Sequence, residues 1–127
     1  MKHTALKVRL IPTKEQQRLL WMHAGTRRYA YNFAKNYSEN YYNKYNKTIS
    51  AYDIRKVFIS QYNQIPWIKD ICKDVPCEAI LDYGKARKKS FKDFNDGFHT
   101  SFKSKHDLYQ GFAIDPRKVK IDGKVYL

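Results

Sequence analysis

The chain lacks the short motifs that mark the commonest catalytic and metal sites. It has only two cysteines, Cys72 and Cys77, which do not form C-x-x-C and have no second pair to complete a zinc site. Neither a P-loop nor G-x-G-x-x-G occurs, and the histidines form no H-E-x-x-H. No two acids fall on neighbouring predicted strands, as a two-metal nuclease requires. We therefore expect no metal, no cofactor and no enzyme activity from this chain alone.

Long apolar runs are also missing. No stretch reaches the roughly 18 apolar residues of a membrane span. The start, MKHTA, lacks the apolar core of a signal peptide. The sequence therefore predicts a cytoplasmic protein without a membrane partner, whose two thiols are free.

Negative charge is scarce, with 12 Asp and Glu against 25 Lys and Arg, which gives a formal net charge of +13. Such an excess favours a polyanionic partner. Four of the cations, Lys85, Lys88, Lys89 and Lys92, follow the i, i+3, i+4, i+7 spacing of one helix face. The other face carries a set of apolar residues that we expect to face the core: Ile80, Tyr83, Phe91, Phe94 and Phe98. Arg87 also falls on that face, where we expect it to pair or to reach across a groove. The alternatives for this lysine stripe are an ordinary solvated helix face and an anionic membrane surface.

The remaining patterns predict a predominantly helical α+β fold. Residues 6–10 alternate between apolar and basic side chains, as expected for a strand, and Pro12 ends that strand. Thr13 and Gln16 form a capping box that starts a first helix, and Gly25 is expected to end it. Aromatic residues at every fourth position then mark a second helix, as a ridge that suits a core better than a base-stacking platform: Tyr29, Phe33, Tyr37, Tyr41 and Tyr45. Ser50 caps a third helix, with Ile54 and Phe58 inward, and Pro76 opens the fourth, which carries the lysines.

The C-terminal residues alternate around Asp122 and Gly123, as expected for a β-hairpin. We expect this hairpin and residues 6–10 to form a small antiparallel sheet, with the four-helix lobe inserted between them. The predicted segments are residues 1–11 (strand), 12–98 (helical lobe) and 99–127 (basic connector and hairpin). The apolar pattern of the last predicted strand continues up to Leu127. This suggests either the front part of a longer protein or an open sheet edge through which a homodimer could form.

Several motifs, in order, resemble the opening of TnpB (OrfB), the transposon-encoded RNA-guided nucleases. Residues 6–16 (LKVRLIPTKEQ) and 25–32 (GTRRYAYN) are similar to the family's R-L-x-P-x-x-x-Q and A-R-F/Y-V-Y-N. Residues 75–94 and the segment FKSK at 102–105 are similar to its later helix and to the basic connector before a hairpin. Ile11, Asn95 and Thr100 depart from the pattern.

The resemblance implies a wedge strand, a helical recognition lobe and a first wedge hairpin from a prokaryotic cell or its virus. It also implies guide RNA and target DNA as partners, and an RNase H-like nuclease and a zinc ribbon that would lie beyond Leu127. The fourth helix near Cys77 and Leu81 would contact the duplex beside the target.

The residues we expect at phosphates are all basic: Lys7, Arg9, Arg27, Arg28, Lys85, Lys88, Lys89, Lys92, Lys103 and Lys105. For Arg28, Tyr31 and Asn32, nucleic-acid contact and a structural joint between the first two helices fit equally well. A standalone helical DNA-binding regulator or protein-interaction module without a nuclease is the alternative function, and a degenerate remnant without activity is a weaker one.

Overall fold

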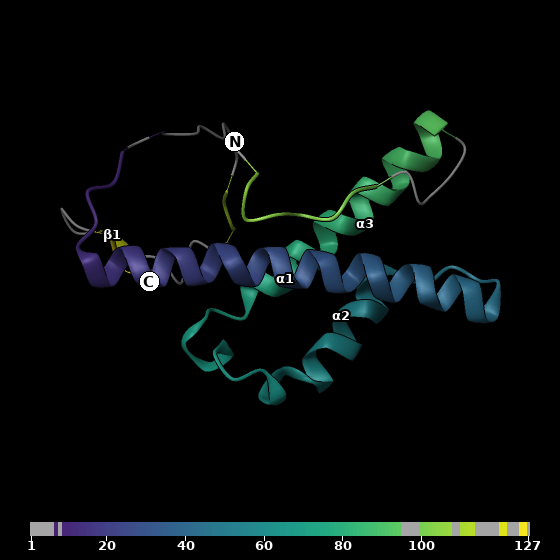
Figure 1. Ribbon diagram of the computed structural model, residues 1–127, viewed down its shortest axis with the longest axis horizontal. Coiled ribbons are helices and arrows are strands. Elements are labelled where there is room, and N and C mark those ends of the chain that lie inside the picture. Colours follow the sequence, from purple (N-terminus) through teal and green to yellow (C-terminus); the bar gives the residue numbers. More distant parts are fainter. Residues whose placement is uncertain are drawn as a thin grey trace, which may run out of the picture.

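The computed structural model describes residues 7, 9–94, 100–107, 110–113, 120–121 and 125–126. This part contains the helices α1 (Lys14–Tyr45), α2 (Ala51–Ser60) and α3 (Asp74–Phe94). The 3₁₀ turns η1 (Tyr62–Gln64) and η2 (Ile68–Asp70) link α2 to α3, and the strands β1 (Lys120–Ile121) and β2 (Val125–Tyr126) follow. Figure 1 shows α1 as the long axis of the molecule, crossed by α3 and flanked by α2.

Local capping fixes where α1 and α2 begin. The Gln16 amide N–H donates to the Thr13 hydroxyl at 3.2 Å and the Thr13 N–H donates to the Gln16 side chain at 2.9 Å, so the predicted capping box is confirmed. The Ser50 hydroxyl accepts from the Asp53 N–H at 3.2 Å and caps α2 as predicted. At its other end α1 stops at Asn46, whose left-handed backbone (φ 53°) closes the last turn.

The predicted stop at Gly25 is wrong, because α1 runs unbroken through it for 32 residues. A glycine ends a helix when the chain adopts a left-handed turn there, and Gly25 has ordinary helical backbone. The next residue, Thr26, is fully buried and donates its hydroxyl to the Met22 carbonyl at 2.8 Å inside the helix. The two helices expected on either side of Gly25 are therefore one.

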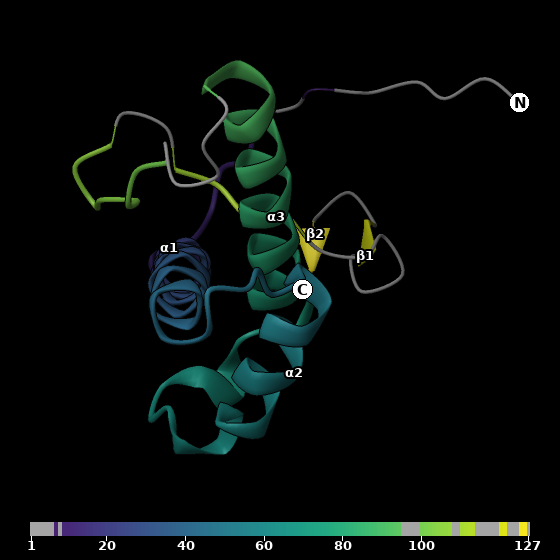
Figure 2. The same cartoon turned by 90° about the vertical axis from the view of Figure 1, so that its right-hand side faces the viewer.

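The core lies where the three helices meet, as the view along α1 in Figure 2 shows. Helix α1 packs mainly against α3 and contributes the small residues Ala30 and Ala34, both fully buried. The predicted inward residues Ile54 and Phe58 of α2 are confirmed, each 1% exposed. At Gly84 of α3, an added Cβ would lie 2.8 Å from the Cβ of Ala51, so α2 and α3 approach each other closely there.

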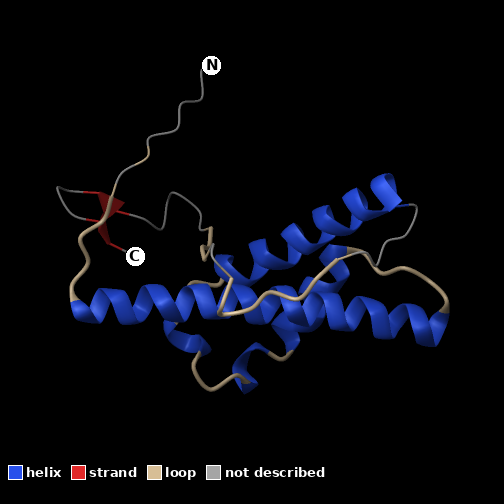
Figure 3. Cartoon of the chain, turned by 45° about the horizontal axis from the view of Figure 1, so that its top comes forward, coloured by secondary structure: helices blue, strands red, loops and turns tan. Residues whose placement is uncertain are grey.

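The predicted sheet is wrong. Lys7, Arg9 and Leu10 lie in no strand, and Ile11 is 94% exposed, while Leu6 and Val8 fall outside the described residues. The strand pairing that the structure describes is limited to β1 and β2, two residues each, which face one another antiparallel with Ile121 opposite Val125 (Figure 3). An alternating pattern indicates which side chains would share a face of a strand, but it does not identify the strand's partner, and Lys7, Arg9 and Leu10 have no strand partner among the described residues. The prediction was a four-helix lobe inserted between the two parts of a small sheet. The described chain is instead an assembly of three helices.

Two aromatic predictions on α3 are also wrong. Phe91 and Phe94 are 46% and 59% exposed, although they lie on the same side of the helix as the buried Tyr83. The reason is length: the last turns of α3 extend past α1, as Figure 1 shows, so the described residues cover that side less fully than they cover Tyr83. Phe98, which was also expected to face the core, lies outside the described residues.

The aromatic ridge of α1 is core only in its middle. Phe33 packs edge-on against Phe58 of α2 with ring centroids 5.3 Å apart, and Tyr37 stacks on Phe33 at 5.8 Å. Towards the end of the helix, Tyr41 and Tyr45 contact each other at 4.8 Å, and Tyr45 is 51% exposed. Among the described helices, none is long and apolar enough to cross a membrane.

Candidate nucleic-acid interface

The lysine stripe of α3, defined as Lys85, Lys88, Lys89 and Lys92, is exposed at all four positions. The opposite side of the same helix holds Ala79, Ile80 and Tyr83, each fully buried against the other helices. Helix α3 therefore separates the two kinds of residue as the spacing predicts, with the ammonium groups on its outer side. Cys77 and Leu81 are half-buried and lie two turns and one turn before Lys85, respectively, on this outer side.

Helix α3 is held in place by contacts from its inner side. Arg87 donates from Nη1 to the Ile49 carbonyl at 2.9 Å, which joins α3 to the segment before α2. The Tyr83 ring meets Tyr31 of α1 edge-on with centroids 5.6 Å apart. On the outer side of α3, burial raises the pKa of the Cys77 thiol above its ordinary value of 9.0, so this thiol stays protonated at neutral pH. The stripe is thus presented on a fixed support.

The connector, residues 100–107 and 110–113, lies beside α1 and is hydrogen-bonded to it (Figures 1 and 2). The Asn32 side chain donates from Nδ2 to the Lys103 carbonyl at 2.9 Å and accepts from the Lys103 N–H at 2.7 Å. Arg28 donates to Gln110 Oε1 at 2.5 Å, and Gln110 donates onward to the carbonyls of Ser104 and Asp107 at 3.0 Å each. Asn32 and Arg28 are therefore joints between α1 and the connector.

Tyr31 lies at the centre of this junction. It is 5% exposed, and the Lys103 ammonium sits 4.8 Å from its ring centroid. Burial raises the pKa of the Tyr31 hydroxyl above its ordinary value of 10.0, and the Arg27 charge partly opposes that rise. Together with the Asn32 bonds, these contacts make Tyr31 part of the packing between α1, α3 and the connector.

The predicted residues therefore fall into separate places. One group, Arg28, Tyr31, Asn32 and Lys103, meets at the connector junction, on the inner side of α3. A second group, Cys77, Leu81 and the lysine stripe, shares the outer side of α3. Lys105 is exposed in the connector, Arg27 is half-buried on α1, and Lys7 and Arg9 are exposed ahead of α1.

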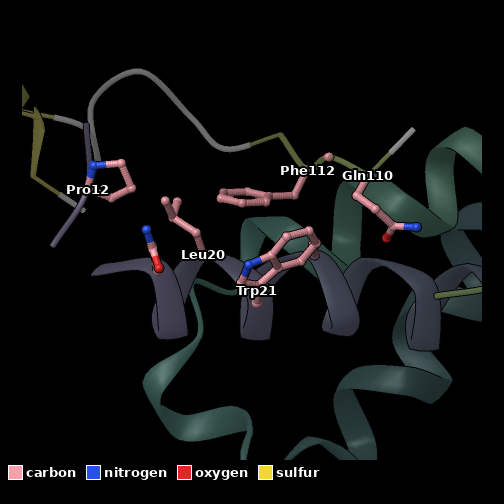
Figure 4. Close-up of a pocket in the computed structure, with 8 residues that line it drawn as sticks. Pro12, Leu20, Trp21, Gln110 and Phe112 are labelled. Carbon is pink, nitrogen blue, oxygen red and sulfur yellow. The ribbon is translucent and has the colours of Figure 1, made fainter. Parts of the chain in front are cut away.

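Sequence reasoning missed two features near these groups. Lys35 is only 5% exposed, pairs with Glu39, and lies 4.9 Å from the Phe102 ring centroid, so this cation is structural. A hollow between the start of α1 and the end of the connector is lined by Trp21 and Phe112 (Figure 4). The i, i+4 spacing of Gln17 and Trp21 was the available signal for the hollow, but the connector side could not be foreseen. No group of three or more His, Cys, Asp or Glu residues is placed to hold a metal in the described part of the chain.

Comparison with known proteins gives one match. Residues 1–47 match the family model of a helix-turn-helix domain of the OrfB type from IS605 elements. No curated protein and no solved structure matches the chain. Within the matched region the structure describes one continuous helix from residue 14, not two helices separated by a turn. The match confirms the predicted family for this region, and it places the N-terminal part of the chain, residues 1–47, in the TnpB/OrfB family of IS605-type mobile elements of prokaryotes.

Proposed function

We propose that this chain is the nucleic-acid-binding N-terminal module of a TnpB-like, transposition-associated RNA-guided DNA endonuclease. On this proposal it holds guide RNA and target DNA and performs no hydrolysis by itself. Residues 1–11 precede the recognition lobe of residues 12–98, and residues 99–127 connect the lobe to the rest of the protein.

The observation that carries the proposal is the lysine stripe on the outer side of α3. Four exposed ammonium groups in line along about two helical turns suit a phosphate backbone, which offers regularly spaced negative charges. A duplex containing RNA is bound chiefly through its shape and its backbone, so a lysine row without base-reading side chains is sufficient for it. The net charge of +13 adds long-range attraction of the same sign.

A standalone DNA-binding regulator is the second candidate, because helix-turn-helix domains read duplex DNA. Such a domain places a separate second helix in the major groove. In this chain the corresponding residues form part of the single helix α1, with Tyr31 and Ala34 buried in the core. This arrangement favours backbone contact through α3 over base reading through α1.

The experiment compares two variants that remove equal charge. The stripe variant carries Lys85→Gln, Lys88→Gln, Lys89→Gln and Lys92→Gln. The control variant carries Lys14→Gln, Lys44→Gln, Lys47→Gln and Lys69→Gln, all at exposed positions. Fluorescence anisotropy measures the affinity of each for a structured RNA, an RNA–DNA hybrid and a DNA duplex of equal length.

We expect the wild-type chain and the control variant to bind the RNA and the hybrid at least as tightly as the DNA duplex, and the stripe variant to bind all three weakly. A clear preference for duplex DNA that survives in the stripe variant would support the regulator instead. Absence of binding to every nucleic acid would leave a protein-interaction module.

A further inference from the structure

An open hollow of about 410 Å³ lies between the first turns of α1 and the end of the connector (Figure 4). Its volume is in the range of small-molecule sites, roughly 300–1,000 Å³. Its lining contains two aromatic rings, two side-chain amides and no charged side chain: Pro12, Gln17, Leu20, Trp21, Ala24, Gln110, Gly111 and Phe112. The hollow is therefore suited to a flat, neutral, partly polar group.

The two rings differ in how they are held. Phe112 lies 5.1 Å from the buried His23 ring, centroid to centroid. His23 is fixed in turn, since its Nδ1 lies 2.7 Å from the Leu19 carbonyl and its Nε2 accepts from the Cys72 N–H at 3.4 Å. Trp21 is 63% exposed and makes no ring contact with the described residues. The Phe112 ring is thus a fixed wall of the hollow, and the Trp21 ring is an open surface on which a ligand could stack.

The two amides also differ. Gln110 is committed to the connector through its bonds with Arg28, Ser104 and Asp107. The Gln17 side chain makes no hydrogen bond to the described part of the chain, although it lines the hollow. A free carboxamide offers a donor and an acceptor side by side, which is the arrangement that pairs with the edge of adenine.

We propose that this hollow binds one unpaired nucleobase, with Trp21 stacking on one face, Phe112 closing the hollow and Gln17 pairing with the edge of the base; adenine fits the amide best. The inference rests on the proposed nucleic-acid-binding function and adds a base-binding site to the phosphate-binding stripe. Because no charged group lines the hollow, its contribution to affinity is independent of salt, whereas that of the stripe is not.

The test uses two duplexes that differ at one position, an unpaired adenine in one and an abasic nucleotide in the other. Stacking on an aromatic side chain contributes a factor of roughly 5 to 150 in affinity. We expect the wild-type chain to prefer the adenine duplex by a factor in this range, and Trp21→Ala and Gln17→Ala to reduce the preference. Trp21→Ala should leave the salt dependence of binding unchanged, and the stripe variant should keep the adenine preference.

A direct readout comes from Trp67→Phe, which leaves Trp21 as the only tryptophan of the chain. Its emission should be quenched saturably by the adenine duplex and less by the abasic duplex. Equal affinity for both duplexes, with unchanged Trp21 emission and the stripe dependence intact, overturns the base site and leaves the proposed function standing. Loss of all nucleic-acid binding overturns both.

Discussion

At the scale of single residues, Asn32 joins two segments that are 71 positions apart in the sequence. Its amide satisfies both the N–H and the carbonyl of Lys103, so removing it leaves two backbone groups without their partner. We expect Asn32→Ala to lower the free energy of unfolding by about 1–3 kcal/mol in urea titrations, with faster hydrogen exchange at the Lys103 amide. Asn36→Ala, one turn later and exposed, is the control and should change stability by less than about 0.5 kcal/mol. Equal effects of the two variants would mean that the connector is not docked through Asn32.

Tyr31 gives the connector junction a dependence on pH. Burial raises its folded pKa above 10.0, the value expected in the unfolded chain, so the unfolded state loses this proton first as the pH rises. The stabilisation is complete below about pH 10 and is lost as the pH rises through the folded pKa. We expect the free energy of unfolding to fall above about pH 10, and less steeply in Tyr31→Phe. Tyr62 and Cys77, whose pKa values burial also raises, account for a remaining decline, which for Cys77 begins above about pH 9. An identical decline in Tyr31→Phe would show that the Tyr31 hydroxyl is not buried.

At the scale of the elements, two glycines inside helices predict opposite effects of the same substitution. A Cβ at Gly84 would lie 2.8 Å from the Cβ of Ala51, which forces α2 and α3 apart. Overpacking costs about 1–3 kcal/mol, against about 1 kcal/mol gained from helix propensity. Gly84→Ala should therefore lower the stability by up to about 2 kcal/mol.

Gly25→Ala should instead stabilise the protein by roughly 0.5–1 kcal/mol. The nearest atom to its added Cβ is the Arg28 Nη2 at 3.4 Å, an ordinary contact with a flexible side chain. Thermal unfolding of both variants measures the contrast. Destabilisation by Gly25→Ala would indicate that α1 bends or ends there, as the sequence alone suggested.

The elements also show where sequence patterns are sufficient. Thr13 and Ser50 were predicted correctly because a cap depends on residues three positions apart. The N-terminal strand was not, because a strand needs a partner that periodicity does not name. Phe91 and Phe94 lie on the apolar side of α3, but they are exposed. Sequence periodicity does not show where a helix extends beyond the helices that pack against it.

At the scale of the whole molecule, the candidate site was only half predictable. The lysine stripe could be derived because its spacing lies within one helix. The roles of Arg28 and Asn32 could not, since their partners Gln110 and Lys103 come from the distant connector. The hollow at Trp21 was missed for the same reason, because Phe112 closes it from the far end of the chain.

On the proposed function, the outer side of α3 binds phosphates. The decisive measurement is the slope of log K against log salt for a structured RNA, made on the wild-type chain, the stripe variant and the control variant. Each neutralised phosphate contributes about −0.7 to −0.9 to that slope. Because the four lysines do not all neutralise a full phosphate, the stripe variant should have a slope flatter by roughly 2 to 3 units. Its thermal stability should be nearly unchanged, because all four lysines are exposed. The control variant should keep most of the wild-type slope. Equal losses of slope in the two variants, or no loss in either, would contradict a phosphate site on α3.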